Sequence, residues 1–186
     1  AQRVEIGDAS GVTILNQSLV ISNSGDGGEV YINGDIVSYG DSGLSIYGSG
    51  YTTTIGPGAG DVSGGTPQTQ DGITTLSLVG DVTITDSVII KGNVVIESTQ
   101  GNITIQNPGT ITGNGDQTPD ILTLRAPQGE VSIIGGIGGS GLNELIVVAN
   151  NTDTLTTSLE SLSISVAMGE INVDEGEVFN YFPSSY

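Results

Sequence analysis

The chain contains no cysteine, no histidine and no tryptophan. Without cysteine, a disulfide framework and thiolate chemistry are both excluded. Without histidine, the chain lacks the most common general base and the most common transition-metal ligand. The sequence therefore predicts a non-enzymatic protein.

Basic residues are also scarce. Three Lys and Arg stand against 21 Asp and Glu, which gives a formal net charge of −18. Nucleic-acid binding depends on basic side chains that neutralise phosphates, so the composition argues against a nucleic-acid partner. It argues equally against anionic membrane surfaces, and it favours either bound cations or strong solvation.

Long hydrophobic runs are missing as well, since no run approaches the roughly 18 to 20 apolar residues that a membrane helix needs. No membrane insertion is expected. Aromatic residues make up only 4% of the chain, whereas glycine occurs 30 times. A core of Val, Ile and Leu with few rings suits thin, regular layers. The Ser/Thr richness and the absence of Cys are typical of exported prokaryotic proteins, which predicts an extracellular or cell-surface location.

The chain does contain a short sequence motif that occurs several times. The unit is Gly, then an acid or amide, then Val or Ile. Its copies are Gly28-Glu29-Val30, Gly34-Asp35-Ile36, Gly80-Asp81-Val82, Gly92-Asn93-Val94, Gly101-Asn102-Ile103 and Gly129-Glu130-Val131. After three of them, apolar residues alternate with Thr or Ser at the two-residue period of a strand. These apolar residues are Val82, Ile84, Ile103, Ile105, Val131 and Ile133.

The spacing of these units predicts the fold class. Gly101 follows Gly80 by 21 residues, and Gly129 follows Gly101 by 28, with a polar insertion at 114–120 accounting for the excess. Gly34 and Gly80 are 46 residues apart, which suits two repeats of 23. A period of about 20 to 23 residues predicts an all-β parallel β-solenoid (β-helix) of roughly seven or eight coils. A meandering antiparallel sandwich stays open as an alternative, because Asn33-Gly34 is a hairpin-type turn signal.

One domain over residues 1–186 is expected, with a surface loop at 56–71 and an aromatic tail at 174–186. Three short strands are predicted near the start, at 4–6, 12–15 and 19–21. Near the end, the pattern Leu-x-x-Leu-x-Val/Ile occurs at Leu142 and again at Leu159, and this offset of 17 predicts that like residues stack on like.

Two stretches carry a resemblance to a known family. INGDIVSYGDSGLSIYGSGYTTTI and VSIIGGIGGSGLNELIVVA, the second followed by LTTSLESLSISV, resemble the β-strand-repeat regions of exported surface proteins and filamentous-haemagglutinin-like adhesins. The resemblance covers roughly residues 32–173. It implies a right-handed parallel β-helix that serves as an extracellular rod or adhesive stalk.

Two motifs could bind a ligand. Gly136–Gly141 matches G-x-G-x-x-G, but a strand pattern follows where a dinucleotide site needs a helix, so we interpret the glycines as a tight corner. Four acids lie in a Gly-rich region and could ligate Ca²⁺ through their oxygens. They are Asp26, Glu29, Asp35 and Asp41. The alternative is that they are solvated turn acids that protect sheet edges from aggregation.

Parallel β-helices also occur among carbohydrate-active enzymes. Lyases of this kind use basic residues beside calcium, and here only Arg3, Lys91 and Arg125 exist, far apart in the sequence. A two-carboxylate glycosidase stays open, since two of the many acids could face each other.

The aromatic residues are confined to two places. Four tyrosines lie at positions 31, 39, 47 and 51, and we expect them to stack on one face. Four more aromatic residues lie in the last eight positions of the chain. We expect them either to cover the open end of the solenoid or to bind another copy of the protein. The predicted assembly interface combines both chain ends: Val4, Ile6, Phe179, Tyr181, Phe182 and Tyr186.

These observations predict a structural extracellular protein that assembles with copies of itself into a filament, sheath or surface layer. Open solenoid ends either need caps or join other copies. A rod segment of a surface adhesin that binds surface glycans is one alternative, and a carbohydrate-active β-helix enzyme is another.

Overall fold

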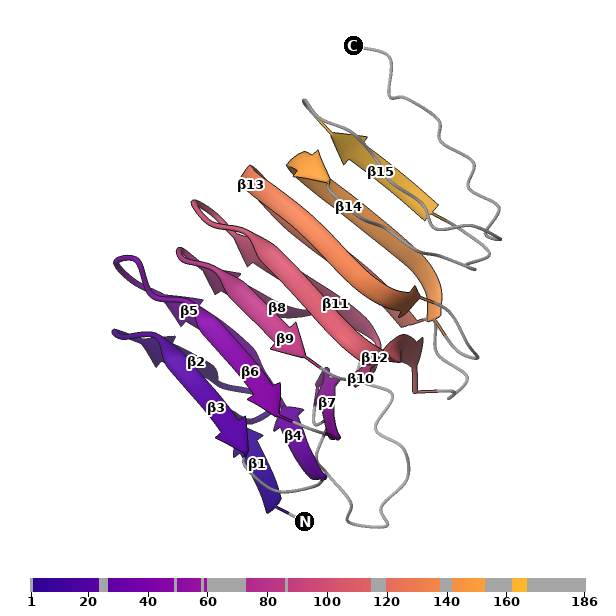
Figure 1. Ribbon diagram of the computed structural model, residues 1–186. Helices are drawn as coiled ribbons and strands as arrows, with labels where there is room; N and C mark the ends of the chain where they lie inside the picture. Colours follow the sequence, from indigo (N-terminus) through magenta and orange to yellow (C-terminus); the bar gives the residue numbers. More distant parts are fainter. Residues whose placement is uncertain are drawn as a thin grey trace.

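The computed structural model describes residues 2–23, 27–48, 50–57, 59, 73–85, 87–114, 120–137, 142–152 and 162–166. Across these residues the chain forms fifteen β-strands, which lie side by side along one axis (Figure 1). Every pairing between described strands is parallel. No helix in the described part is long and apolar enough to cross a membrane.

The strands form three runs, because each early strand pairs with the strand three places later in the chain. Run 1 contains β1 (Gln2–Ile6), β4 (Gly28–Ile32), β7 (Tyr51–Ile55) and β10 (Ser87–Ile90). Run 2 contains β2 (Val12–Leu15), β5 (Asp35–Ser38), β8 (Ile73–Leu78) and β11 (Asn93–Ser98). Run 3 contains β3 (Leu19–Asn23), β6 (Leu44–Gly48) and β9 (Val82–Thr85).

The later strands are longer and pass from one run into another. β12 (Ile103–Gly113) pairs with β9 through its first residues and with β10 through its last. β13 (Asp120–Ile137) begins against β11 in run 2 and ends against β12. β14 (Leu142–Thr152) lies on β13, and β15 (Leu162–Val166) lies on β14 at the far end of run 2.

The predicted all-β class and parallel pairing are therefore confirmed. Asn33-Gly34 connects β4 to β5, which belong to different runs, so the hairpin considered as an alternative does not form at this turn. The predicted offset of 17 is also confirmed, since Leu145 pairs with Leu162 and Val147 with Ile164. The loop predicted at 56–71 falls almost wholly outside the described residues, and the tail at 174–186 falls entirely outside them.

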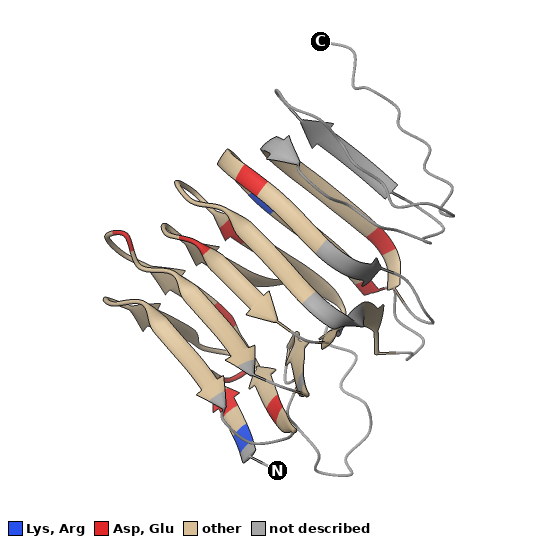
Figure 2. Ribbon diagram, in the orientation of Figure 1, with Lys and Arg blue, Asp and Glu red and all other residues tan. Residues whose placement is uncertain are grey.

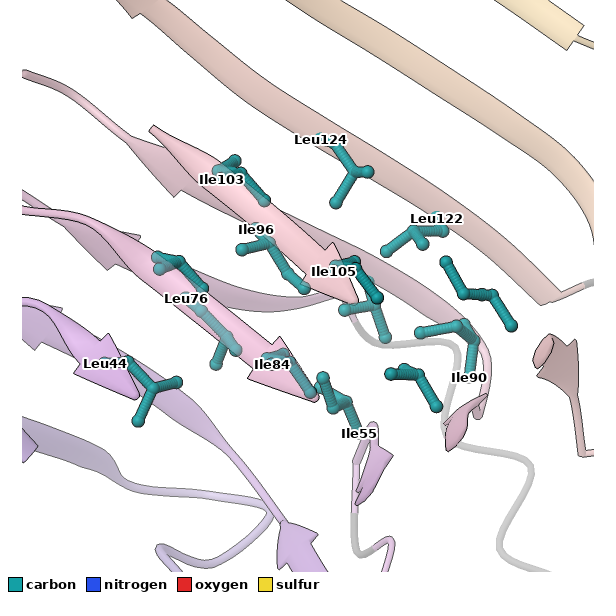
Figure 3. Packing of buried hydrophobic residues seen from close by; sticks show 14 of the residues in the cluster. Leu44, Ile55, Leu76, Ile84, Ile90, Ile96, Ile103, Ile105, Leu122 and Leu124 are labelled. Carbon is teal, nitrogen blue, oxygen red and sulfur yellow. The ribbon is translucent and has the colours of Figure 1, made fainter. Parts of the chain in front are cut away.

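The core consists of columns of like residues that the parallel register aligns. One column begins in run 3 and continues into β12 and β13: Ile46, Ile84, Ile105 and Ile133 follow one another across four strands, each 0% or 1% exposed. In run 2, Ile36, Leu76, Ile96, Leu124 and Val147 do the same, and all are fully buried. Side chains from neighbouring strands point into the same interior (Figure 3). The six apolar residues that alternate with Thr or Ser in the sequence pattern are all buried.

The repeated glycines lie where successive turns stack backbone on backbone. Gly80, Gly101 and Gly129 occupy the same corner, just before β9, β12 and the Val131 segment of β13. A Cβ on Gly101 would lie 2.5 Å from Asp81 Oδ1, and one on Gly129 would lie 2.1 Å from the Gly101 carbonyl oxygen. Since such contacts are impossible, only glycine allows the turns to approach this closely.

The sequence-based alignment of the other copies was wrong. Gly34 and Gly92 precede β5 and β11 in run 2, whereas Gly80 precedes β9 in run 3. The 46-residue distance from Gly34 to Gly80 therefore joins two different corners. The Gly-acid-Val unit is a general way to begin a strand after a turn, so it recurs at more than one corner of each repeat.

Thr53 is the polar member of an otherwise apolar column. It lies between Val30 and Val88 in run 1, it is fully buried, and its Oγ1 has no hydrogen-bond partner among the described residues. Burying a hydroxyl without a partner costs free energy.

We expect Thr53→Val to raise the free energy of unfolding by about 1 to 2 kcal/mol, because it removes an unsatisfied hydroxyl and keeps the side-chain shape. The measurement is chemical denaturation followed by circular dichroism. Thr54→Val, on the outward side of the same strand, is the matched control and should change stability by less than about 0.5 kcal/mol. A neutral or destabilising Thr53→Val would contradict the expectation.

Candidate interaction surface

The first strand of each run forms an open edge of the molecule. Among the described residues, β1 pairs only with β4, β2 only with β5 and β3 only with β6. These three strands lie together at the N-terminal end (Figure 1). No other described strand pairs with their outer sides, and such strand edges are favourable sites for pairing with a further strand.

The apolar interior reaches this edge without being fully covered. Val4, Leu15 and Leu19 pack against the core but are only partly buried. The partners of Val4 and Leu19 on the next strands, Val30 and Leu44, are 0% exposed. The first strand of each run thus leaves core side chains open to solvent on its edge side.

Apolar residues also occupy outward positions near this edge. Val12 and Ile14 on β2 and Val20 on β3 are 56%, 56% and 53% exposed. Neither β2 nor β3 carries a charged residue (Figure 2).

The outer side of run 1 near the same edge is polar instead. Arg3 Nε donates to Glu5 Oε1 at 2.8 Å, and the guanidinium carbon of Arg3 lies 4.4 Å from the centre of the Tyr31 ring. Burial, followed by the charge of Glu29, raises the pKa of the Tyr31 phenol above its ordinary value. One of the three basic residues is thus paired with an acid and stacked on an aromatic ring.

A ladder of side chains binds successive turns at the corner between runs 2 and 3. Asp81 Oδ1 accepts a hydrogen bond from the Asn102 backbone N–H at 2.8 Å, and Asn102 Oδ1 accepts one from the Glu130 N–H at 2.8 Å. Each side chain satisfies a backbone donor on the next turn, which the strand ladders leave unpaired. The acid or amide in the repeated unit therefore has a structural role at this corner.

A second ladder occupies the corner between runs 1 and 2. Asp120 is fully buried, and its carboxylate accepts hydrogen bonds from the Gly92 N–H at 2.6 Å and the Asn114 N–H at 2.9 Å. The Asp120 N–H donates in turn to Asn143 Oδ1 at 2.9 Å. Backbone N–H donors thus fix the position of this buried side chain at the corner.

We expect Asn102→Ala to lower the free energy of unfolding by about 1 kcal/mol, because the Glu130 N–H loses its acceptor. Asn102→Asp keeps an acceptor oxygen and should recover most of the loss. Gln100→Ala, an exposed position in the same turn, is the control and should be close to neutral. Equal stability of the Ala and Asp variants would show that the ladder bond contributes nothing.

The predicted calcium ligands lie on separate parts of the fold. Glu29 lies on the outer side of β4, Asp35 begins β5, and Asp41 lies in the exposed turn after β5. Asp35 Oδ1 accepts a hydrogen bond from the Thr75 N–H at 2.8 Å. Asp26 falls outside the described residues. Within the described part, no group of three or more Asp and Glu is placed to hold a metal ion, and the calcium site stays a prediction.

The tyrosines do not form the predicted stack. Tyr31 lies on β4 in run 1, Tyr39 in the turn after β5, and Tyr47 on β6 in run 3. The eight-residue spacing of these three residues is far from the register offset of 23 residues between β4 and β7, so they do not follow one another along one run. Tyr51 is in run 1, as Tyr31 is, but it is aligned with Gly28, and Tyr31 is aligned with Thr54. Tyr39 and Tyr47 are exposed at 57% and 44%.

The remaining predicted residues are divided between the two ends of the chain. Val4 and Ile6 both lie on β1, Ile6 is 9% exposed and belongs to the core, and the assembly interface stays a prediction. Phe179, Tyr181, Phe182 and Tyr186 lie outside the described residues. The G-x-G-x-x-G motif begins at the end of β13, and Gly138–Gly141 are likewise outside the described residues.

The sequence analysis missed the exposed apolar residues Val12, Ile14 and Val20, since an apolar residue in a strand gives no sign of which side it faces.

Asp8 in the turn between β1 and β2 has a lowered pKa. The main cause is the Ser10 backbone N–H, which donates to Asp8 Oδ1 at 2.9 Å, and the Ser10 hydroxyl adds a second bond at 2.9 Å. Because folding favours the ionised form, Asp8 stabilises the fold above the unfolded pKa of about 3.9, and this stabilisation is lost as pH falls through the lower folded pKa.

We therefore expect the melting temperature of the wild type to exceed that of Asp8→Ala at neutral pH, and the difference to shrink as the pH falls below about 4. Thermal melts of both proteins from pH 7 to pH 2 give the measurement. Ser10→Ala removes the hydroxyl donor but keeps the backbone donor, so its Asp8 titration midpoint should lie between those of the wild type and an unfolded chain. A difference that is independent of pH would exclude a contribution from the carboxylate charge.

Comparison with known proteins assigns no family to the chain. No protein-family model, no curated protein and no solved structure matches it.

Proposed function

We propose that the protein is a non-enzymatic structural protein of the cell surface that assembles end to end into a filament, sheath or layer. The observation that carries the proposal is the open edge formed by β1, β2 and β3, where core residues are only partly covered. Exposed parallel edges with apolar interiors pair readily with further strands. The calcium and glycan partners expected from the sequence belong to this proposal as secondary partners.

The architecture we propose for the building block is a right-handed parallel β-solenoid, akin to the β-strand-repeat surface proteins that the sequence resembles. Its support is the register of the runs: Val82 pairs with Ile103 at an offset of 21 residues, and Asn93 pairs with Ile73 at an offset of 20. Larger offsets, such as 38 from Leu44 to Val82, span the segment at 56–71. Right-handedness follows from the strong preference of parallel crossover connections for that hand.

End-to-end contact between solenoids joins two different surfaces, so it does not close after two copies. Such heterologous contacts generate open filaments when no rotation closes a ring. The outward side chains along the runs include the polar residues Thr83, Thr104 and Glu97, which favour contact with water on the outer faces of the runs. The edge formed by β1, β2 and β3 is then the part of the molecule that binds another copy. Assembly along one axis is the geometry that this distribution favours.

The test is the size and shape of the purified protein, measured by light scattering and negative-stain microscopy over a range of concentrations, with and without calcium. We expect long, regular fibres or tubes. Leu19→Lys places a charge at a partly buried edge position and should abolish them, since inward charges block edge pairing. Ser22→Lys, outward on the same strand, is the matched control and should still assemble.

A wild-type protein that stays monomeric at every concentration would overturn the assembly proposal. The rod segment of a surface adhesin would then be the better account, because its solvated sides and stacked strands need no second copy.

A further inference from the structure

We propose that the open edge of β2 pairs in parallel with β15 of a second copy of the chain, in the register that continues run 2 from one copy into the next. This inference rests on the proposed function and deepens it, because it names the strand that binds the edge and the residues that become aligned across the joint.

β2 and β15 are the two ends of the same run. Run 2 passes from β2 through β5, β8, β11, the first part of β13 and β14 to β15, and every pairing along it is parallel. Among the described residues, β2 pairs only with β5, and β15 only with β14. Each of these two strands therefore has one side on which no described strand lies, and the two sides face opposite ways along the axis (Figure 1).

This arrangement lets a second copy bind by translation along the axis, with the small rotation that the twist of a sheet requires. At about 4.8 Å per strand spacing, β2 and β15 of one chain are roughly 29 Å apart. A copy displaced by one further spacing, roughly 34 Å in all, places its β15 beside β2 of its neighbour. The two strands then run in the same direction, as in every other described pairing, and their backbone groups form a parallel ladder.

The corner between runs 2 and 3 gives the stack a direction, which favours this head-to-tail contact over a head-to-head one. Side chains of one turn accept hydrogen bonds there from backbone N–H groups of the following turn: Ser18 Oγ from Gly43 at 3.1 Å, Asp81 Oδ1 from Asn102 at 2.8 Å, and Asn102 Oδ1 from Glu130 at 2.8 Å. A head-to-tail contact brings an acceptor side of this corner to a donor side, whereas a head-to-head contact brings two donor sides together.

The inward residues of run 2 determine the register of the joint. The buried column of this run extends to Thr13 on β2 and to Ile164 on β15. Continuing the column places Ile164 beside Thr13, and the same register places Val166 beside Leu15. Leu15 is only partly buried at the edge, so this register covers it with an apolar neighbour. A shift of one residue would instead align the two serines of β15 with the inward residues of β2.

An outward row of the same run predicts which residues meet on the outer face of the joint. It begins at Ile14, which is 56% exposed, and passes through Val37, Ser77, Glu97, Arg125 and Val148 to Ser165. Ser165 of one copy therefore lies beside Ile14 of the next, and the same register places Ser163 beside Val12. These two pairs can be altered without a change in the core.

Engineered disulfides test the joint in the full-length protein, because the chain contains no cysteine. Four proteins each carry one substitution: Val12→Cys, Ile14→Cys, Ser163→Cys or Ser165→Cys. Aligned residues on neighbouring strands lie about 4.8 Å apart, which is within the Cα–Cα range of a disulfide. Residues shifted by two positions lie about 8 Å apart, which is too far for a bridge without backbone movement.

Mixing these proteins in pairs gives two matched and two crossed mixtures. The matched mixtures combine Val12→Cys with Ser163→Cys, and Ile14→Cys with Ser165→Cys, while the crossed mixtures exchange the partners. After mild oxidation we expect roughly tenfold more covalent dimer in the matched mixtures, measured by non-reducing gel electrophoresis. Each protein occurs in one mixture of each kind, so differences in thiol reactivity cancel.

Light scattering on the same mixtures separates this inference from the proposed function. Association with equal cross-linking in matched and crossed mixtures, or with no cross-linking, would overturn the inference while end-to-end assembly stands. A covalent dimer of Ile14→Cys alone, in excess of the matched mixture, would indicate a head-to-head contact and would also overturn it. Absence of association in the wild type and in all four variants would overturn both.

Discussion

Parallel pairing between strands that are about one repeat apart is the interaction on which the rest of the structure depends. Each pairing aligns a residue with its equivalent on the next turn, as Ile84 is aligned with Ile46 and Ile105. Apolar residues therefore meet apolar residues in continuous buried columns, and the core needs no aromatic side chains to fill it. Thr53 is a polar member of such a column that has no hydrogen-bond partner in the described part of the chain.

Close stacking places strict demands on the corners. Backbone approaches backbone so tightly at Gly101 and Gly129 that a Cβ would overlap the previous turn. The backbone donors at these corners are satisfied by side chains such as Asp81 and Asn102. The glycine and the acid or amide that follows it thus act together at the corner. The glycine has no Cβ to overlap the neighbouring backbone, and the side chain of the acid or amide accepts a hydrogen bond from a backbone N–H.

The same geometry has a consequence at the end of the stack. A run of parallel strands satisfies its interior strands on both sides but leaves the first one with a free edge and a partly covered core, as Leu19 shows beside the fully buried Leu44. Val12 and Ile14 on β2 and Val20 on β3 are also more than half exposed on the outward sides of their strands. The partly covered core residues Val4, Leu15 and Leu19 all lie on the first strands of the runs, which is why the proposed assembly is directed along the axis.

The sequence by itself determined the strand periodicity, the all-β class and the offset of 17 between β14 and β15, and it favoured parallel over antiparallel pairing without excluding the latter. Alternation and repeat spacing encode these directly. Only the tertiary structure decided which corner each glycine occupies, that Tyr31 and Tyr47 lie on different runs, and that Val12 and Val20 face outward. A strand of alternating residues has two sides, and only its register with neighbouring strands determines which side faces the core.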